Sequence, residues 1–184
     1  MSQVNLTTRI ATPDDVKILL SLIRSAYRGE ESRKGWTTEA DLVADDRIDE
    51  AGVLAKITAS NGIILLATTD SGALIACCEL IKRDSDLGYF GLFAVDPNQQ
   101  GGGLGRRMLQ MAENYARETL DVKKLEMTVI GVRVELISWY VRRGYTVTGE
   151  QRPFPYEHLV NDQVGKTRND LYFDVLVKDM IAVA

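Results

Sequence analysis

The sequence predicts an α+β fold, with a mixed, mostly antiparallel β-sheet flanked by helices in a single domain over residues 1–184. Segments of strand-like and helix-like apolar periodicity follow one another in the order β-α-α-β-β-β-α-β-α-β-β. One helix joins two strands as a βαβ crossover, whereas short turns join the strands before it into a meander and the last two into a hairpin. The chain has no repeats or linkers, and its 45% hydrophobic content suits one core.

The N-terminal elements are a strand over Val4–Ile10 and the helix that follows it. In the sequence ATPDD, Thr12 is typical of a helix N-cap and Pro13 of the first helical position. Apolar residues at helical spacing then extend as far as Tyr27. A polar, irregular stretch leads to a second helix, which we expect over Asp49–Ala59.

Turn residues separate the remaining elements. We expect strands at Ile63–Thr69, Leu74–Lys82 and Leu87–Val95, a helix from Leu104, a strand at Lys123–Ile130, a helix at Val134–Arg143, a strand from Tyr145, and a last strand at Leu171–Lys178. The apolar alternation of the last strand suits the edge of a homodimer.

The charge balance limits the classes of partner. The chain carries 22 Lys and Arg against 26 Asp and Glu, a net charge of −4. This argues against nucleic acid as a partner and is compatible with cationic substrates. We find no signal-like N-terminus and no apolar run that could span a membrane, so we expect a cytoplasmic protein with no membrane association.

The cysteines and the histidine give little sign of redox or metal chemistry. Cys77 and Cys78 are adjacent on a predicted strand, so their side chains point to opposite faces, and we expect core residues rather than a disulfide. The only histidine is His158, and no Cys/His cluster has metal-ligand spacing. We therefore expect no metal site.

The sequence VDPNQQGGGLGRRML, residues 95–109, contains four glycines between a strand and a helix. Glycine lets the backbone approach a ligand closely, and a helix N-terminus favours an anion. The loop lacks the lysine of a P-loop, and Arg106 occupies the third position after Gly103, where a dinucleotide fingerprint requires glycine. An anion-binding loop and a flexible surface loop both remain open on this evidence.

Two motifs resemble those of the GNAT superfamily of acyl-CoA-dependent N-acetyltransferases. The stretch LFAVDPNQQGGGLGRRML matches the central motif of that superfamily at Val95, Pro97, Gln100, Gly103 and Gly105. The stretch LISWYVRRGY matches a second motif at Tyr140, Gly144 and Tyr145. The element order agrees over nearly the whole chain. The resemblance implies a GNAT-like fold, acetyl-CoA as co-substrate, and transfer of the acetyl group to an amine.

The resemblance also implies a set of cofactor-binding residues. Main-chain groups of Phe93 and Val95 should contact the pantetheine arm. The pyrophosphate cradle should consist of Gln100, Gly101, Gly102, Gly103, Gly105 and Arg106. A β-carbon at Gly103 should obstruct the cradle. Arg133 departs from the pattern, because the family often has asparagine there; its side chain either reaches a phosphate or is solvated.

Tyr140 matches the proton donor of the family and is the expected catalytic acid, with a core aromatic residue as the alternative. The resemblance implies direct attack of the amine, and a covalent route through Cys77 or Cys78 lacks an activating neighbour. The general base is less defined, because Tyr89 stands where some members have glutamate.

Glu79 is the first candidate base, because a carboxylate on an apolar strand is costly unless a cleft or a partner solvates it. Its alternative is an exposed strand end, paired with Lys82 or Arg83. Glu126 is the second candidate, but it alternates with Thr128 on the expected polar face of its strand, which favours a solvated residue without a catalytic role. A water relay that needs no fixed base is the third reading.

Two loops are the candidates for binding the acceptor amine. Long loops often carry specificity, so the segment around Trp36 and the loop RPFPYEHLV are the expected walls, with His158 either lining the site or on the surface. An acidic run either attracts a cationic amine or is a solvated helix start: Asp45, Asp46, Asp49 and Glu50.

The leading hypothesis is an N-acetyltransferase that acts on a primary amine of a small molecule or peptide. The rival hypothesis is a catalytically inactive acyl-CoA-binding sensor or regulatory domain. A nucleotide-binding module is disfavoured by the absent P-loop lysine.

Overall fold

The protein is described by a computed structural model over residues 5–161 and 167–180. Its seven strands form one sheet in the order β1-β2-β3-β4-β5-β7-β6. They are β1 (Thr7–Ile10), β2 (Gly62–Thr68), β3 (Leu74–Lys82), β4 (Leu87–Val95), β5 (Lys124–Ile130), β6 (Thr146–Pro153) and β7 (Tyr172–Asp179). Only the β4–β5 pair is parallel among these strands, so the predicted mixed, mostly antiparallel sheet is confirmed.

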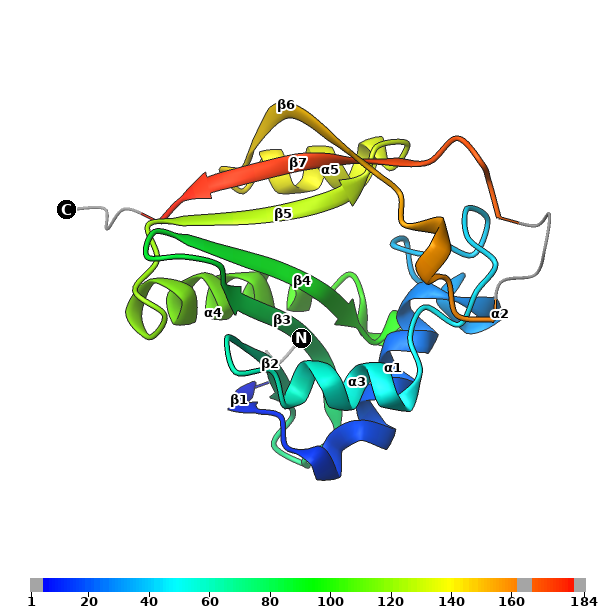
Figure 1. Cartoon of the computed structure of the whole chain (residues 1–184). Coiled ribbons are helices and arrows are strands. Elements are labelled where there is room, and N and C mark those ends of the chain that lie inside the picture. Colours follow the sequence, from blue (N-terminus) through cyan, green and yellow to red (C-terminus); the bar gives the residue numbers. More distant parts are fainter. Residues whose placement is uncertain (1–4, 162–166, 181–184) are drawn as a thin grey trace.

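The helices cover both faces of the sheet (Figure 1). They are α1 (Val16–Tyr27), α2 (Gly29–Ser32), α3 (Glu50–Ile57), α4 (Leu104–Glu118) and α5 (Val134–Val141). The apolar faces of α1 and α3 pack on one side of β2–β4, and α4 packs on the other side together with α5. Cys77 and Cys78 illustrate the two layers, because each is fully buried but in a different core cluster.

Local rules explain the element starts. Thr12 and Pro13 open a 3₁₀ turn, Pro13–Asp15, that continues into α1, as the ATPDD pattern predicts. The third residue of this turn, Asp15, accepts a hydrogen bond from the Thr12 main-chain N–H at 2.8 Å. Asp49 precedes α3 and accepts a hydrogen bond from the Gly52 N–H at 2.7 Å, so it caps that helix.

Three details differ from the sequence-based expectation. The short helix α2 lies in the stretch expected to be irregular, and β6 continues to Pro153, into the expected loop. The last strand, β7, lies between β5 and β6 and is not at the edge. The argument for a homodimer through an edge at the last strand is therefore wrong, although a homodimer itself stays a prediction. Val4, the first residue of the expected first strand, lies outside the described residues.

The parallel pair separates soon after it begins. Residues Leu87–Tyr89 of β4 pair with Lys124–Glu126 of β5, and no pairing follows beyond them in the described sheet. The β4 strand has a bulge there: its register against β3 shifts, and Leu92 adopts a left-handed φ of 46°. The sheet is thus split in its middle (Figure 1), with the C-terminal ends of β4 and β5 apart.

Candidate active site

Two cavities open where β4 separates from β5. The first, the glycine-loop cavity, has a volume of about 250 Å³ and lies between the end of β4, the start of α4 and α5. The second, the sheet cavity, has a volume of about 390 Å³ and is lined by both diverging strands and by residues of the segment 28–48. The linings share five side chains: Tyr27, Phe93, Arg133, Leu136 and Tyr140. Molecules bound in the two cavities would therefore meet at this junction.

The glycine loop leaves open space at the start of α4. Gly101 and Gly103 have φ values of 94° and 77°, a left-handed conformation that glycine adopts at little cost. A β-carbon built on either residue, or on Gly102, meets no atom within 4 Å. Gly103 is also the N-cap of α4, whose first N–H groups have no partner within the helix. This arrangement suits an anion.

Most residues predicted to bind the cofactor line this cavity. They are Phe93, Val95, Gln100, Gly101, Gly103, Gly105, Arg106 and Arg133, whereas Gly102 is not among its lining residues. The Phe93 carbonyl accepts a hydrogen bond from the Tyr27 hydroxyl at 2.7 Å. The contacts of these residues with a cofactor stay predictions.

The side chain of Gln100 holds a neighbouring segment against the loop. Its Oε1 accepts a hydrogen bond from the Trp36 N–H at 3.0 Å, and its Nε2 donates to Thr37 Oγ1 at 3.0 Å. A β-carbon at Gly35 would lie 2.6 Å from Gln100 Oε1, so the packing there requires glycine. Trp36 consequently lines the glycine-loop cavity and not the sheet cavity.

Two further side chains of this cavity were not predicted to bind the cofactor. The guanidinium of Arg143 lies 3.5 Å from the ring centroid of Trp139, and both residues line the cavity. The Nε atom of Arg143 is buried without a hydrogen-bond partner. Burial, helped by the nearby positive charges of Arg142 and Arg106, lowers the pKa of Arg143. An anion here would stabilise that charge. Helical spacing alone did not distinguish Arg143 from a surface arginine.

Tyr140 stands at the junction of the two cavities. Its ring is buried, packed edge-on against Trp139 at 5.0 Å and Tyr145 at 5.7 Å between centroids. No hydrogen bond joins its hydroxyl to another described residue, so the hydroxyl is free to donate to a ligand. Burial raises the pKa of Tyr140 well above its ordinary value, which keeps the phenol protonated.

Glu79 and Glu126 are both buried, but they differ in position. Glu79 lines the sheet cavity, where both carboxylate oxygens accept hydrogen bonds from Lys56 Nζ, at 2.9 and 2.8 Å. Its expected alternative partners are engaged elsewhere: Lys82 with the Leu120 carbonyl and Arg83 with Glu126. Arg152 also binds Glu126, which does not line the cavity. The sheet cavity thus favours Glu79 over Glu126.

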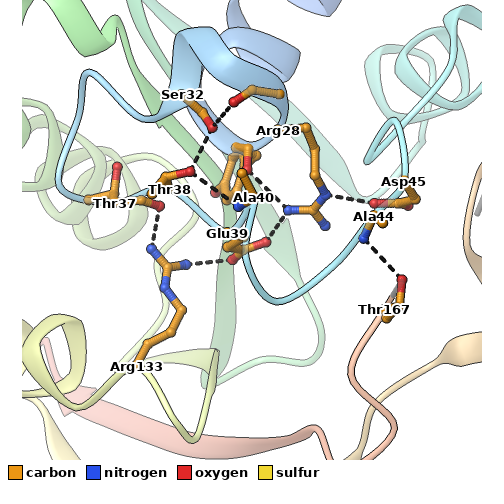
Figure 2. Close-up of polar contacts among 12 residues, drawn as sticks. Arg28, Ser32, Thr37, Thr38, Glu39, Ala40, Ala44, Asp45, Arg133 and Thr167 are labelled. Atoms are coloured by element: carbon orange, nitrogen blue, oxygen red, sulfur yellow. Dashed lines mark hydrogen bonds and ion pairs between the residues drawn. The ribbon is translucent and has the colours of Figure 1, made fainter. Parts of the chain in front are cut away.

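Arg133 is neither solvated nor free. Its side chain is 10% exposed and donates to Glu39 Oε1 at 2.5 Å and to the Thr37 carbonyl at 2.5 Å. Figure 2 shows the Glu39 carboxylate between Arg133 and Arg28, and Arg28 also binds Asp45 at 2.6 Å. The alternative of a solvated Arg133 is wrong, and its contact with a phosphate stays a prediction.

Burial acts to raise the pKa of the Glu39 carboxyl. The positive charges of Arg133, Arg28 and Arg47 outweigh it and hold that pKa below its ordinary value. Glu39 is therefore ionised at neutral pH. Sequence reasoning missed Arg28 and Glu39, because nothing in a polar stretch distinguishes a buried ion pair from solvated charges.

The acidic run does not face either cavity. Asp45 is buried in the network with Arg28, and Asp49 caps α3. Asp46 lies 3.6 Å from Arg24. Only Asp49 and Glu50 form the start of α3, and none of the four residues of the run lines either cavity. The proposal that this run attracts a cationic amine has no support in the structure.

The predicted C-terminal wall is present in part. Phe154 and Pro155 of the RPFPYEHLV sequence line the sheet cavity, whereas His158 is exposed and lines neither cavity. From the N-terminal segment, Arg47 and Ile48 line the same cavity. Both of the expected wall segments thus contribute residues to the sheet cavity, although Trp36 itself does not, and their contact with an acceptor stays a prediction.

Cysteine chemistry is disfavoured at this site. Burial raises the pKa of Cys77 to about 12 and also raises that of Cys78, and neither residue lines the two cavities. Within residues 5–161 and 167–180, no group of three or more His, Cys, Asp or Glu side chains could hold a metal ion. No helix in the same ranges is long and apolar enough to cross a membrane.

Comparisons with known proteins agree with this geometry. The S-(2-succino)cysteine N-acetyltransferase of Bacillus subtilis is 30% identical over 150 residues, which cover 78% of this chain and 86% of that protein. The mycothiol acetyltransferase of Propionibacterium freudenreichii is 26% identical over 139 residues. That match covers 73% of this chain but only 41% of the relative, so the chain spans less than half of its length.

A solved structure shows the same fold. The spermidine/spermine N-acetyltransferase SpeG of Vibrio cholerae superposes with a TM-score of 0.66 at 18% identity, over 95% of this chain and 92% of that one. A sequence model of the acetyltransferase (GNAT) family matches residues 19–145, which include the glycine loop and Tyr140. Because this match spans more than half of the chain, the protein belongs to the GNAT family of acetyltransferases.

Proposed function

We propose that the protein transfers an acetyl group from acetyl-CoA to a primary amine of a small molecule or peptide, by direct attack of the amine on the thioester. The observation that carries this proposal is the position of Tyr140. Tyr140, whose hydroxyl is protonated and has no hydrogen-bond partner among the described residues, lines both the glycine-loop cavity and the sheet cavity. A donor is needed there if the thioester enters from one cavity and the amine from the other.

The glycine-loop cavity has the features that a CoA pyrophosphate requires. Open space lies above Gly101 and Gly103, and the first N–H groups of α4 are unpaired within the helix. Arg106 and Arg143 add positive charge to the lining. The buried, unpartnered Nε of Arg143 is an independent sign that this lining fits an anion.

The transfer then needs two proton movements. The amine nitrogen attacks the thioester carbon, the C–N bond forms, and collapse of the tetrahedral species breaks the C–S bond, with the electron pair leaving on sulfur. Tyr140 donates its proton to that sulfur, which yields CoA thiol. The excess proton of the amine passes to Glu79, directly or through water, because this carboxylate lies in the sheet cavity. Before the next turnover the Tyr140 phenolate regains a proton, and the proton taken up from the amine is released.

The experiment that tests this function is turnover of the Tyr140→Phe variant. The phenylalanine keeps the ring packing but removes the proton donor, so turnover should fall by about 100-fold or more. The dissociation constant for acetyl-CoA, measured by calorimetry, should stay within about twofold, because the hydroxyl makes no contact in the cradle. Tyr115→Phe is the matched control, since Tyr115 lines neither cavity.

Equal turnover in the Tyr140→Phe variant would remove Tyr140 from the mechanism. Tight acetyl-CoA binding by the wild type, with no acetylation of any amine, would instead favour the sensor hypothesis.

A further inference from the structure

The sheet cavity has an unbalanced set of charges. Its charged lining residues are Arg28, Arg47, Lys56, Arg83, Arg133, Glu39 and Glu79. The whole chain is negative, yet cations outnumber carboxylates in this cavity. The ion pairs of these residues show which cation has no counter-ion.

Four of the five cations have counter-ions. Lys56 binds Glu79, and Arg83 binds Glu126 just outside the cavity. Arg28 and Arg133 share Glu39, and Arg28 also binds Asp45 (Figure 2). Each carboxylate in and around the cavity is thus already engaged by a cation.

Arg47 is the fifth cation, and it has no paired carboxylate among the described residues. It forms no hydrogen bond or ion pair with any other described residue, and its Nε is buried without an acceptor. Its guanidinium lies 4.9 Å from the ring centroid of Tyr27, a contact that supplies no acceptor. Arg47 also has a φ of 67°, a left-handed conformation that non-glycine residues adopt rarely.

Arg47 stays charged. Burial acts to lower its pKa, but the negative charge of Glu39 and weaker interactions leave that pKa above its ordinary value. Arg47 is only partly buried, but its buried Nε loses hydration and gains no hydrogen-bond acceptor in return, which is costly. An anion in the sheet cavity would remove this cost, and a carboxylate matches the two-pronged geometry of a guanidinium.

The location of Arg47 connects it to the reaction. Tyr27, whose ring faces Arg47, lines both cavities and donates its hydroxyl proton to the Phe93 carbonyl. Arg47 is therefore one side chain away from the junction that contains Tyr140. A small molecule that contacts Arg47 can extend from there towards the reacting thioester.

We propose that Arg47 binds a carboxylate of the acceptor, so that the acceptor is an amine that also carries a carboxylate, the chemical class of the amino acids. This inference rests on the proposed function, because it names the substrate class of the same site. It also excludes polyamines as preferred acceptors, since a second or third ammonium group would face an unpaired guanidinium.

The first experiment compares amino acids with their uncharged amides, and with a polyamine. Three acids are tested: S-carboxymethylcysteine, methionine and phenylalanine. Each is paired with the same compound in which every carboxylate is converted to an amide. Spermidine is the polyamine. For at least one pair, kcat/KM should be about tenfold or more higher for the acid than for the amide. Equal or better use of the amides or of spermidine would overturn the proposal, while the acetyltransferase function would stand.

The second experiment changes the arginine. Arg47→Gln should raise the KM of the carboxylate acceptor by about tenfold or more, with little change for its amide, and Arg47→Lys should restore part of the loss. Arg33→Gln is the matched control, because Arg33 belongs to the same polar segment but lines neither cavity and binds Asp41. Equal KM values in wild type and the Arg47→Gln variant would count against the proposal.

A third measurement separates this inference from the proposed function. Calorimetric binding of the three amino acids, with CoA present, needs no turnover. Binding to the wild type and at least about tenfold weaker binding to the Arg47→Gln variant would support the carboxylate site even if nothing is acetylated. Failure of the wild type to bind any of the carboxylates would overturn it. Acetyl-CoA affinity and thermal unfolding of each variant report whether the fold is intact.

Discussion

The two cavities that meet at Tyr140 are built in different ways. The glycine-loop cavity takes 8 of its 17 lining residues from one short stretch, residues 93–106, and the others from residues 26–37 and from α5 and its flanks. The sheet cavity collects side chains from Tyr27 to Phe173, over most of the chain. The first depends on backbone conformation and the absence of β-carbons, and the second on a buried network of ion pairs.

This difference determines what each cavity tolerates. The glycine-loop cavity, which is formed largely by backbone groups, is sensitive to the conformation and size of a few residues but hardly to distant charge. A buried ionic network fails when one member is lost, because the remaining charge has neither water nor a partner. Substitutions can therefore separate the two modes of construction.

The largest effect is expected at Glu39. Glu39→Gln leaves Arg28 and Arg133 without the carboxylate that they share, and should lower the free energy of unfolding by about 3 kcal/mol in chemical denaturation at pH 7. Glu31→Gln is the control, because its ion pair with Lys34 is exposed and its loss should cost less than about 1 kcal/mol. Similar losses in both variants would show that the network does not stabilise the sheet cavity.

The same variant gives a pH dependence. The folded-state pKa of Glu39 lies below its ordinary value of 4.5, so its ionised form stabilises the fold above that pH and loses this effect as the pH falls through the folded-state pKa. The difference in stability between wild type and the Glu39→Gln variant should shrink as the solution becomes more acidic than pH 4.5. A difference that grows on acidification would contradict the lowered pKa.

A smaller effect, on turnover, is expected at Glu79. If this carboxylate accepts the proton of the amine, Glu79→Gln should lower kcat by about 100-fold and leave acetyl-CoA binding unchanged. Glu126→Gln is the control: Glu126 is equally buried and also paired with cations, two arginines where Glu79 has one lysine, but it lies outside the sheet cavity. Per folded molecule, its kcat should stay within about twofold. Equal losses in both variants would favour a water relay without a fixed base.

The same contrast explains which features the sequence predicts. Contiguous patterns predict the order of strands and helices and place the glycine loop at the start of α4, because periodicity and turn chemistry act over neighbouring residues. The position of Tyr140 at the junction of both cavities likewise agrees with the motif that contains it. The residues of the glycine loop are close in sequence, so a short sequence pattern predicts them.

The residues of the sheet cavity are far apart in sequence, and the sequence predicted fewer of them. Arg133, 94 residues from Glu39, is recognisable as its partner only after folding. The strand order placed β7 inside the sheet, although its alternation also fitted an edge. Arg47 carried no signal at all, since its importance lies in the lack of a counter-ion, which depends on every other pairing in the cavity.

The smallest effect concerns the glycine loop. Gly103→Ala should weaken acetyl-CoA binding by about tenfold, because a methyl group enters the space where the backbone approaches the pyrophosphate. Gly72→Ala separates this effect from backbone strain: Gly72 has a similar φ of 82°, its β-carbon would also meet no atom within 4 Å, and it lines neither cavity. Both variants should lose similar stability, yet only Gly103→Ala should lose affinity in calorimetry. If both bind acetyl-CoA like the wild type, the open space at Gly103 is not the pyrophosphate site, and the backbone-built cavity has another use.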